Sequence, residues 1–121
     1  MAADFAYLTT TGRVSGLPRT IEIWFAEIGG TLYLLAGGRE RADWVRNLRK
    51  EPRVRVRIGG PRELSGDLAG TVAAVARDVA DPAEELAARR ALAAKYYGWS
   101  AGEPLDEWSA TALPIAIDLE R

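Results

Sequence analysis

The segment from Gly12 to Arg19 carries residue types that suit the binding of an anion. Its two glycines, Gly12 and Gly16, allow tight backbone turns, and the side chains of Arg13, Ser15 and Arg19 can converge on one group. The planar guanidinium group matches phosphate oxygens, and backbone N–H groups in such a turn add further donors. The alternative interpretation is an ordinary hairpin connection with solvated arginines, and the spacing alone does not decide between the two.

A second basic segment, residues 37–44, reads GGRERADW and includes Arg39 and Arg41. A predicted strand leads through two glycines into a helix whose first turn carries both arginines. Cations at a helix N-terminus oppose the helix dipole by about 0.3–1 kcal/mol each, whereas a bound anion would reverse that sign. No Ser, Thr, Asp or Asn occupies the N-cap position, which favours an anion site. The alternative is local compensation of the two arginines by Glu40 and Asp43.

Two further clusters are less specific. Arginines alternate with aliphatic residues from Arg53 to Ile58, which is typical of a solvated strand face; a nucleic-acid surface would show a basic excess and interleaved aromatic residues.

Four aromatic residues gather near the end of a predicted helix: Tyr96, Tyr97, Trp99 and Trp108. They are interpreted as core packing or as the wall of a pocket for a planar ring, in which Tyr97 or Tyr96 would donate a proton to a reduced substrate.

Composition restricts the chemistry further. The chain has 121 residues, a net charge of −1, no cysteine and no histidine. These counts predict a single domain over residues 1–121, no nucleic-acid partner, no disulfide framework and no metal centre of the common types. The absence of the usual general base favours a borrowed cofactor. No apolar run reaches membrane-spanning length and the N-terminus does not resemble a signal peptide, so we expect a cytoplasmic protein without stable membrane insertion.

The expected elements are about six strands and two helices. Strands are predicted over residues 5–11, 19–26, 31–36, 53–58 and 112–119, with a strand pair or one long bent strand over 63–77 and bends at Gly66 and Gly70. Gly29-Gly30 predicts a two-residue hairpin. In the strand over 53–58, Val54, Val56 and Ile58 are expected to point inward.

The first helix is predicted over residues 40–50, with an inward stripe of Arg41, Trp44, Val45 and Leu48. The second begins at the N-cap Asp81, with Pro82 in the first turn and Glu84 completing a capping box, and ends at Gly98. Short turns between most of these elements imply an α+β domain built on an antiparallel barrel.

Three runs resemble a known family. Residues 8–19 read LTTTGRVSGLPR, residues 44–54 read WVRNLRKEPRV, and residues 111–117 read TALPIAI. The first two runs strongly resemble the deazaflavin-dependent nitroreductase family, which falls within the flavin-reductase-like split-barrel proteins related to pyridoxamine-phosphate oxidase. The third is similar to one branch of it. The resemblance implies an FMN-binding type of split β-barrel that binds 8-hydroxy-5-deazaflavin, coenzyme F-420.

By that likeness the coenzyme tail would meet basic residues and its ring would lie against barrel strands. Arg13, Ser15 and Arg19 would hold the tail, and the strand from Arg19 to Trp24 would lie beside the ring. The remaining cofactor-binding positions implied by the resemblance are Ile21, Ile23, Trp24, Ala36, Gly37, Gly38, Arg39, Arg41, Trp44 and Asn47.

The expected activity is hydride transfer from the reduced coenzyme to a small electron-poor substrate such as a quinone, an enone or a nitroaromatic compound. Three departures from the family leave the specific substrate open: Val14 replaces a frequent Lys or Arg, the glycine-rich segment before the helix is short, and the first strand begins almost at once. The alternatives are a split barrel that binds FMN, FAD or haem, and a non-catalytic coenzyme carrier. A homodimer also stays open, because split barrels frequently complete their grooves across a subunit interface.

Overall fold

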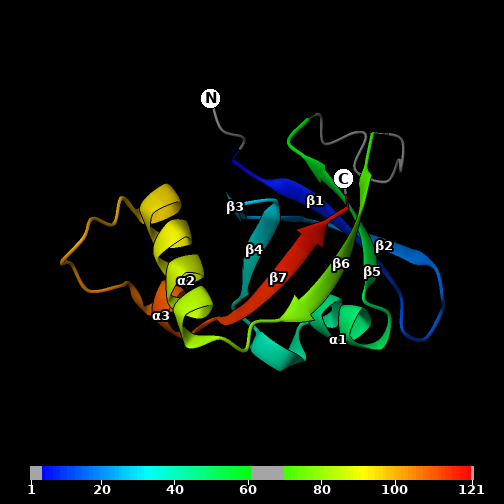
Figure 1. Cartoon of the computed structure of the whole chain (residues 1–121). Coiled ribbons are helices and arrows are strands. Elements are labelled where there is room, and N and C mark those ends of the chain that lie inside the picture. The colour runs from blue at the N-terminus through cyan, green and yellow to red at the C-terminus, as the bar shows by residue number, and fades with distance from the viewer. Residues whose placement is uncertain (1–3, 61–69, 121) are drawn as a thin grey trace.

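In the computed structural model, which describes residues 4–60 and 70–120, seven strands form one antiparallel sheet (Figure 1). Its spatial order is β2-β1-β5-β6-β7-β4-β3. The strands are β1 (Ala6–Thr11), β2 (Pro18–Ile23), β3 (Ala26–Ile28), β4 (Thr31–Ala36), β5 (Arg53–Ile58), β6 (Val72–Asp78) and β7 (Leu113–Leu119). The helices are the 3-10 turn η1 (Arg39–Arg41) and the α-helices α1 (Asp43–Lys50), α2 (Pro82–Tyr97) and α3 (Glu107–Thr111). The α+β class is confirmed.

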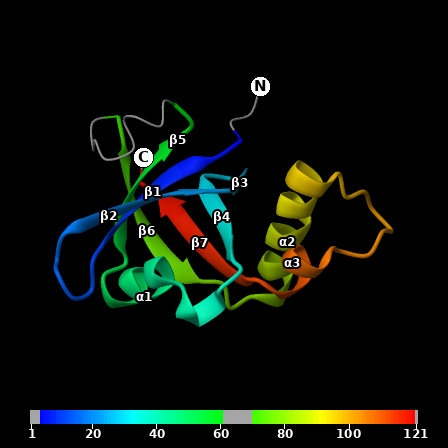
Figure 2. The same cartoon turned by 180° about the vertical axis from the view of Figure 1, so that it is seen from behind.

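The two edge strands of the sheet, β2 and β3, are neighbours in the chain and are joined only by Trp24 and Phe25. Each is paired on one side only, β2 with β1 and β3 with β4. A sheet whose first and last strands are covalent neighbours has to curl back on itself, and both views show that curvature (Figures 1 and 2). The outer edge of β2 is therefore available to line a surface hollow.

The core inside the curl consists of alternate residues from the strands together with one face of α1. Alternate residues of each strand are buried, because successive side chains of a strand point to opposite faces. Val54 and Val56 of β5 and Leu8 of β1 therefore belong to the same core cluster. Val45 and Leu48 of α1 cover one end of that cluster. Leu113, Ile115, Ile117 and Leu119 belong to this cluster, as their alternation predicts. Helix α1 is thereby fixed beneath the start of β5.

A second core lies on the outer face of the sheet, where α2 and α3 cover β3, β4 and β7 (Figure 2). Ala88 and Leu92 of α2 pack there against Tyr33, Leu35 and Ala116. Since β4 is covered on both faces, its residues from Leu32 to Ala36 are all buried, in agreement with a strand that is apolar throughout.

The hairpin at Gly29-Gly30 is confirmed, with φ of 57° and 84° at the two glycines and Ile28 paired with Thr31. The predicted strand over residues 19–26 is wrong in one respect, because it is two strands separated by Trp24 and Phe25. Of the strand pair or long bent strand predicted over 63–77, the part from residue 72 is observed in β6; residues 61–69, including Gly66, lie outside the described residues. The short helix α3 has no counterpart among the predicted elements.

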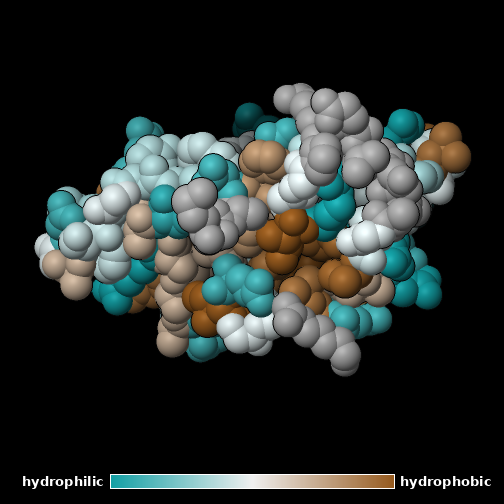
Figure 3. Space-filling model, turned by 90° about the horizontal axis from the view of Figure 1, so that it is seen from above, coloured by the Kyte–Doolittle hydropathy of each residue, from teal (hydrophilic) through white to brown (hydrophobic). Residues whose placement is uncertain are grey.

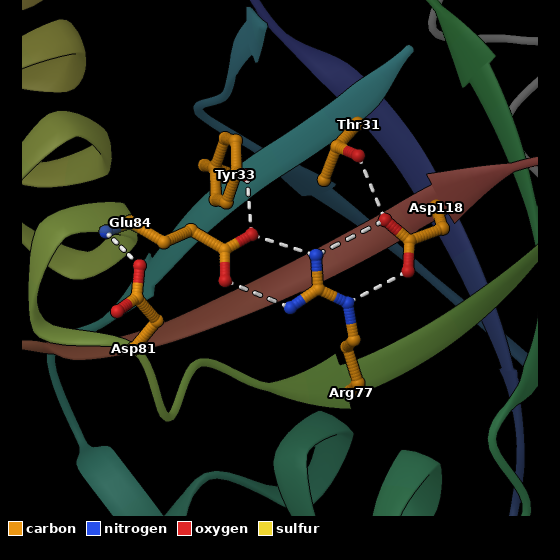
Figure 4. A network of polar contacts seen from close by, with 6 residues as sticks. All are labelled: Thr31, Tyr33, Arg77, Asp81, Glu84 and Asp118. Carbon is orange, nitrogen blue, oxygen red and sulfur yellow. Dashed lines mark hydrogen bonds and ion pairs between the residues drawn. The ribbon is translucent and has the colours of Figure 1, made fainter. Parts of the chain in front are cut away.

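The signals for α2 are confirmed, with one exception. The Asp81 carboxylate accepts a hydrogen bond from Glu84 N at 3.0 Å, and Gly98 ends the helix in the left-handed region at φ 67°. The second half of the predicted capping box is not seen, because the Glu84 carboxylate points away from the helix start (Figure 4). It accepts hydrogen bonds from the Arg77 guanidinium at 2.9 and 2.6 Å and from the Tyr33 hydroxyl at 2.6 Å.

Arg77 also joins α2 to the sheet through Asp118 of β7, whose carboxylate accepts from Arg77 Nε at 2.7 Å and from Thr31 Oγ1 at 2.7 Å. The hydrogen bonds from Arg77 and Tyr33 lower the pKa of Glu84 to about 2. Burial, together with the neighbouring Glu84 carboxylate, raises the pKa of Tyr33. One guanidinium group thus connects β6, β7 and the first turn of α2.

Two predicted inward residues are instead exposed. Arg41 lies in η1, which precedes α1 as a separate turn, and Asn47 takes the buried place on α1. Ile58 ends β5 beyond the packed part of the sheet and is 42% exposed.

In the view from above, apolar residues gather in the middle of the face with hydrophilic ones around them (Figure 3). None of the helices in residues 4–60 and 70–120 is both long and apolar enough to span a membrane.

Candidate coenzyme and acceptor site

The hairpin loop between β1 and β2 is bound directly to α1. The Asn47 side-chain oxygen accepts a hydrogen bond from the backbone nitrogen of Arg13 at 3.1 Å and another from its guanidinium at 2.9 Å. Asn47 is 5% exposed and donates in turn to Thr10 Oγ1 at 3.3 Å. Lys50 Nζ donates to the Arg13 carbonyl at 2.6 Å. The first basic segment is therefore attached to α1, the helix that follows the second basic segment, and it meets that segment at Asp43.

The loop itself is tightly closed and needs a glycine at its base. Gly12 N donates to the Leu17 carbonyl at 2.8 Å, and Gly16 N donates to the Gly12 carbonyl at 2.8 Å. A Cβ atom at Gly12 would lie 2.7 Å from Ser15 Oγ and 3.1 Å from the Leu17 oxygen. The Ser15 hydroxyl accepts from Leu17 N at 3.1 Å, which orients it toward Arg19. Residue 12 must lack a side chain for the loop to keep this shape.

The arginines of the two basic segments differ in whether a carboxylate pairs with them. Arg13 pairs with Asp43 at 3.0 Å, and Arg39 lies 3.7 Å from Glu40 and donates to the Thr111 carbonyl. Within the described part of the chain, Arg19 has one side-chain partner, Ser15 Oγ at 3.4 Å. Local compensation, the alternative for the second basic segment, thus applies to Arg39 through Glu40, whereas Asp43 pairs with Arg13 of the loop. Among the described residues Arg19 keeps a cation without a carboxylate partner.

A groove of about 650 Å³ lies between this loop, β2 and α1. Arg13, Ser15 and Arg19 line one side, Trp44 and Asn47 line the other, and Thr20 and Ile21 form the floor. Charged and polar groups predominate at the loop, while the Trp44 ring adds a flat apolar surface. The groove suits an elongated anion with an adjoining planar part.

A second hollow, of about 510 Å³, lies on the next residues of the same strand. Glu22 and Ile23 of β2 line it together with Trp24, Leu35, Tyr97 and Trp108. The Trp24 ring is 43% exposed and stacks in parallel on Tyr96, with ring centroids 4.3 Å apart and an interplanar angle of 3°. Trp108 meets Trp24 edge-on at 5.5 Å. We call this hollow the aromatic pocket.

The two predicted catalytic tyrosines occupy different places. Tyr97 lines the aromatic pocket and is 53% exposed. The Tyr96 hydroxyl accepts from Phe25 N at 2.9 Å and lies within hydrogen-bond distance of the Phe25 and Asp4 carbonyls. Burial raises the pKa of Tyr96. Of the two, only Tyr97 is placed to meet a molecule in the pocket, and its catalytic role stays a prediction.

The remaining predicted positions fall into two groups. Ile21 and Ile23 pack their side chains on the inner core as well as lining the hollows. Gly37 lies under Trp108, where a Cβ would be 3.6 Å from the indole nitrogen. Five predicted cofactor-binding positions line neither hollow: Ala36, Gly37, Gly38, Arg39 and Arg41. The sequence interpretation did not single out Thr10, Glu22 or Leu35, because nothing in a single strand shows which neighbour approaches it.

Comparisons with known proteins identify the family and the fold. A family model described as F420H(2)-dependent quinone reductase matches residues 1–118. The chain belongs to this family. Its coenzyme is therefore the deazaflavin F-420, and it is an oxidoreductase that depends on that coenzyme.

Solved structures show the same split-barrel fold at low sequence identity. A conserved hypothetical protein from Mycobacterium tuberculosis has a TM-score of 0.77 and 21% identity, covering 98% of this chain and 74% of that one. A reductase described as F420-H2 dependent has a TM-score of 0.67 and 21% identity, with 97% and 94% covered. A putative pyridoxamine 5'-phosphate oxidase from Listeria innocua has a TM-score of 0.66 and 20% identity, with 98% and 85% covered. The predicted split β-barrel is confirmed.

Proposed function

We propose that this protein reduces a small, planar, electron-poor acceptor with hydride from the reduced deazaflavin coenzyme, the acceptor being a quinone, an enone or a nitroaromatic compound. The observation that carries the proposal is the succession of two hollows along β2. Thr20 and Ile21 form the floor of the basic groove, and Glu22 and Ile23 line the aromatic pocket. A coenzyme in the first would bring its reactive end next to a molecule in the second.

The residues of the groove fit an anionic coenzyme. Among the described residues Arg19 offers a guanidinium group without a carboxylate partner, and the tight turn at Gly12 places the Ser15 hydroxyl beside it. We assign Arg19, Ser15 and Arg13 to the coenzyme tail, and Ile21, Trp44 and Asn47 to the part of the groove nearer its ring. When bound, the coenzyme supplies a hydride, which is the difficult part of the chemistry.

The residues of the aromatic pocket would orient the acceptor. The Trp24 ring is fixed on one face by Tyr96, so it offers a flat surface without losing rotamer freedom on binding. Trp108 and Tyr97 limit the pocket from the side and exclude water from the reacting atoms. Reduction of a quinone to a hydroquinone takes up one hydride and one proton, and the Tyr97 hydroxyl is the group that would deliver this proton.

The test of the coenzyme site is a parallel titration with oxidised coenzyme F-420 and with FMN, followed by tryptophan fluorescence. Hydrogen bonds to charged groups are worth about 1.5–3 kcal/mol, so Arg19→Ala should weaken coenzyme binding about ten- to a hundredfold. Arg41→Ala, outside the groove, should have a smaller effect that disappears at high salt. Arg53→Ala, which removes an exposed arginine paired with Glu51, is the matched control. Unchanged affinity in both Arg19→Ala and Arg41→Ala would contradict the site.

The test of the activity is steady-state turnover with a panel of quinones, enones and nitroarenes. Reduction of at least one class with kcat/KM well above the coenzyme-free reaction supports the proposal. Tight coenzyme binding without turnover of any acceptor would instead favour a non-catalytic carrier, and preferential binding of FMN would favour a flavin protein of the same fold.

A further inference from the structure

The two tryptophans of the aromatic pocket come from segments with little structure of their own. Trp24 lies between β2 and β3, outside both strands. Trp108 lies in α3, a helix of five residues that follows a stretch without helix or strand from residue 98 to residue 106. An isolated helix this short does not form in water. Contacts from elsewhere must therefore fix both rings.

Arg89 of α2 fixes the end of α3. Its side chain is nearly buried, and the residue is 9% exposed. Its Nη1 donates to the Ser109 carbonyl at 2.9 Å and to the Ala112 carbonyl at 2.8 Å, while Nε donates to Glu85 at 3.1 Å. A cation at the C-terminus of a helix satisfies carbonyls that have no partner within the helix. Residues 109 and 112 lie one and four positions after Trp108 in the chain. The guanidinium therefore fixes the backbone that carries this ring.

Lys95 and Tyr96 of the same helix fix the connection that carries Trp24. The Tyr96 hydroxyl bonds Phe25 N at 2.9 Å, and Lys95 Nζ donates to the Phe25 carbonyl at 2.9 Å. Lys95 Nζ also lies 3.6 Å from the centroid of the Phe25 ring. The N–H and the carbonyl of Phe25, the residue after Trp24, are thus both held from α2, while the Tyr96 ring stacks on the Trp24 indole.

Helix α2 is itself rigidly attached to the sheet at its other end. Ala88 and Leu92 are fully buried against the sheet, and the Glu84–Arg77–Asp118 contacts tie the first turn to β6 and β7 (Figure 4). The side chains at 89, 95 and 96 therefore project from one fixed helix toward two distant segments of the chain.

We propose that Arg89 and Tyr96 are positioning residues for the acceptor: acting from α2, they hold Trp108 and Trp24 in their edge-on contact and thereby set the shape of the pocket that the acceptor enters. The inference rests on the proposed function, in which the aromatic pocket receives the acceptor. It assigns neither residue a contact with the coenzyme or with the reacting atoms. Loss of either should affect acceptor recognition and leave coenzyme binding unaltered.

The experiment compares Arg89→Met and Tyr96→Phe with wild type and with Arg90→Met, a control on the same helix whose guanidinium lies near Trp99 instead. Tyr96→Phe keeps the stacked ring and removes only the hydroxyl. The measurements are the KM of the best acceptor, the Kd of the coenzyme, and the indole N–H resonances of Trp24 and Trp108, assigned with Trp→Phe variants. Arg89→Lys, which keeps the charge, is included in case Arg89→Met does not fold.

We expect acceptor KM to rise at least fivefold in Arg89→Met and in Tyr96→Phe, with coenzyme Kd within twofold of wild type. The Trp108 resonance should shift in Arg89→Met and the Trp24 resonance in Tyr96→Phe, and neither should shift in Arg90→Met. Arg89→Lys should recover part of the KM. If wild type turns over the acceptor while both variants keep its KM and both resonances, the positioning role is refuted and the proposed function stands. Absence of turnover in the wild type refutes the proposed function instead.

Discussion

The Asn47 side-chain oxygen accepts two hydrogen bonds from Arg13, one from its backbone nitrogen at 3.1 Å and one from its guanidinium at 2.9 Å. This pair connects a hairpin loop to a helix more than thirty positions further along the chain. A buried amide oxygen with two donors fixes the orientation of the loop and its distance from α1. It therefore determines the width of the groove between the loop and α1. Arg13 is consequently a structural partner of α1 as well as a candidate contact for the coenzyme.

Replacement of Asn47 by alanine should loosen that connection. The backbone nitrogen of Arg13 and the hydroxyl of Thr10 lose this partner, while the Arg13 guanidinium keeps Asp43; a buried polar group left unpaired costs about 1–3 kcal/mol. We expect a lower melting temperature and coenzyme affinity reduced about tenfold, measured by thermal unfolding and by fluorescence titration. Asn47→Asp, which keeps both acceptor contacts with Arg13, is the matched control for stability and should lower the melting temperature less, while its charge opposes an anion in the groove. Full affinity in Asn47→Ala would show that the loop finds its position without α1.

Local signals in the sequence predicted most of the fold. The strands β1, β4 and β5, the hairpin at Gly29-Gly30 and the limits of α2 all follow from alternation, glycine placement and capping, which act over a few residues. The break at Trp24–Phe25 was not predictable, because it depends on Lys95 and Tyr96, which are some seventy positions away. The same holds for α3, whose formation depends on Arg89.

The candidate site was predictable as two basic segments but not as a geometry. Glycine and arginine spacing marked residues 12–19 and 37–44, and the structure brings the first segment against α1. The sequence did not show which arginines would lack a carboxylate partner. Asp43 reaches Arg13 only after the chain folds. The inward place given to Arg41 was wrong because Arg41 lies in a separate 3-10 turn before the helix, while Asn47 is buried on α1 beside Val45 and Leu48.

The N-cap of α2 gives a prediction on stability alone. Asp81 accepts from Glu84 N at 3.0 Å, and loss of such a cap costs about 1 kcal/mol. Asp81→Ala should lower the melting temperature by about 4 °C, whereas Asp81→Asn, which keeps a capping oxygen, should change it much less. Differential scanning calorimetry measures both. Equal melting temperatures for the two variants would mean that the cap does not hold the helix start.

Acid should weaken the attachment of α2 to the sheet. The pKa of Glu84 is lowered from 4.5 to about 2 by its hydrogen bonds to Arg77 and Tyr33. Hydrogen bonding to Arg77 lowers the pKa of Asp118 as well. Since both pKa values are lower in the folded state, the stabilisation is complete above about pH 4.5 and is lost as the pH falls toward 2. Glu84→Gln should flatten the fall in melting temperature over this range. An identical pH profile in wild type and Glu84→Gln would contradict the role given to this pair.

The proton that accompanies hydride transfer gives the most direct prediction on chemistry. Tyr97 is the hydroxyl that lines the aromatic pocket, whereas Tyr96 is bound to backbone groups of Phe25. General-acid catalysis by a positioned group typically contributes 10²–10⁴-fold. Tyr97→Phe should therefore lower kcat by at least tenfold while coenzyme affinity stays within twofold, measured by pre-steady-state reduction of a quinone. Tyr96→Phe should raise the acceptor KM with a smaller effect on kcat. If Tyr97→Phe keeps full kcat, the proton comes from solvent and Tyr97 only shapes the pocket.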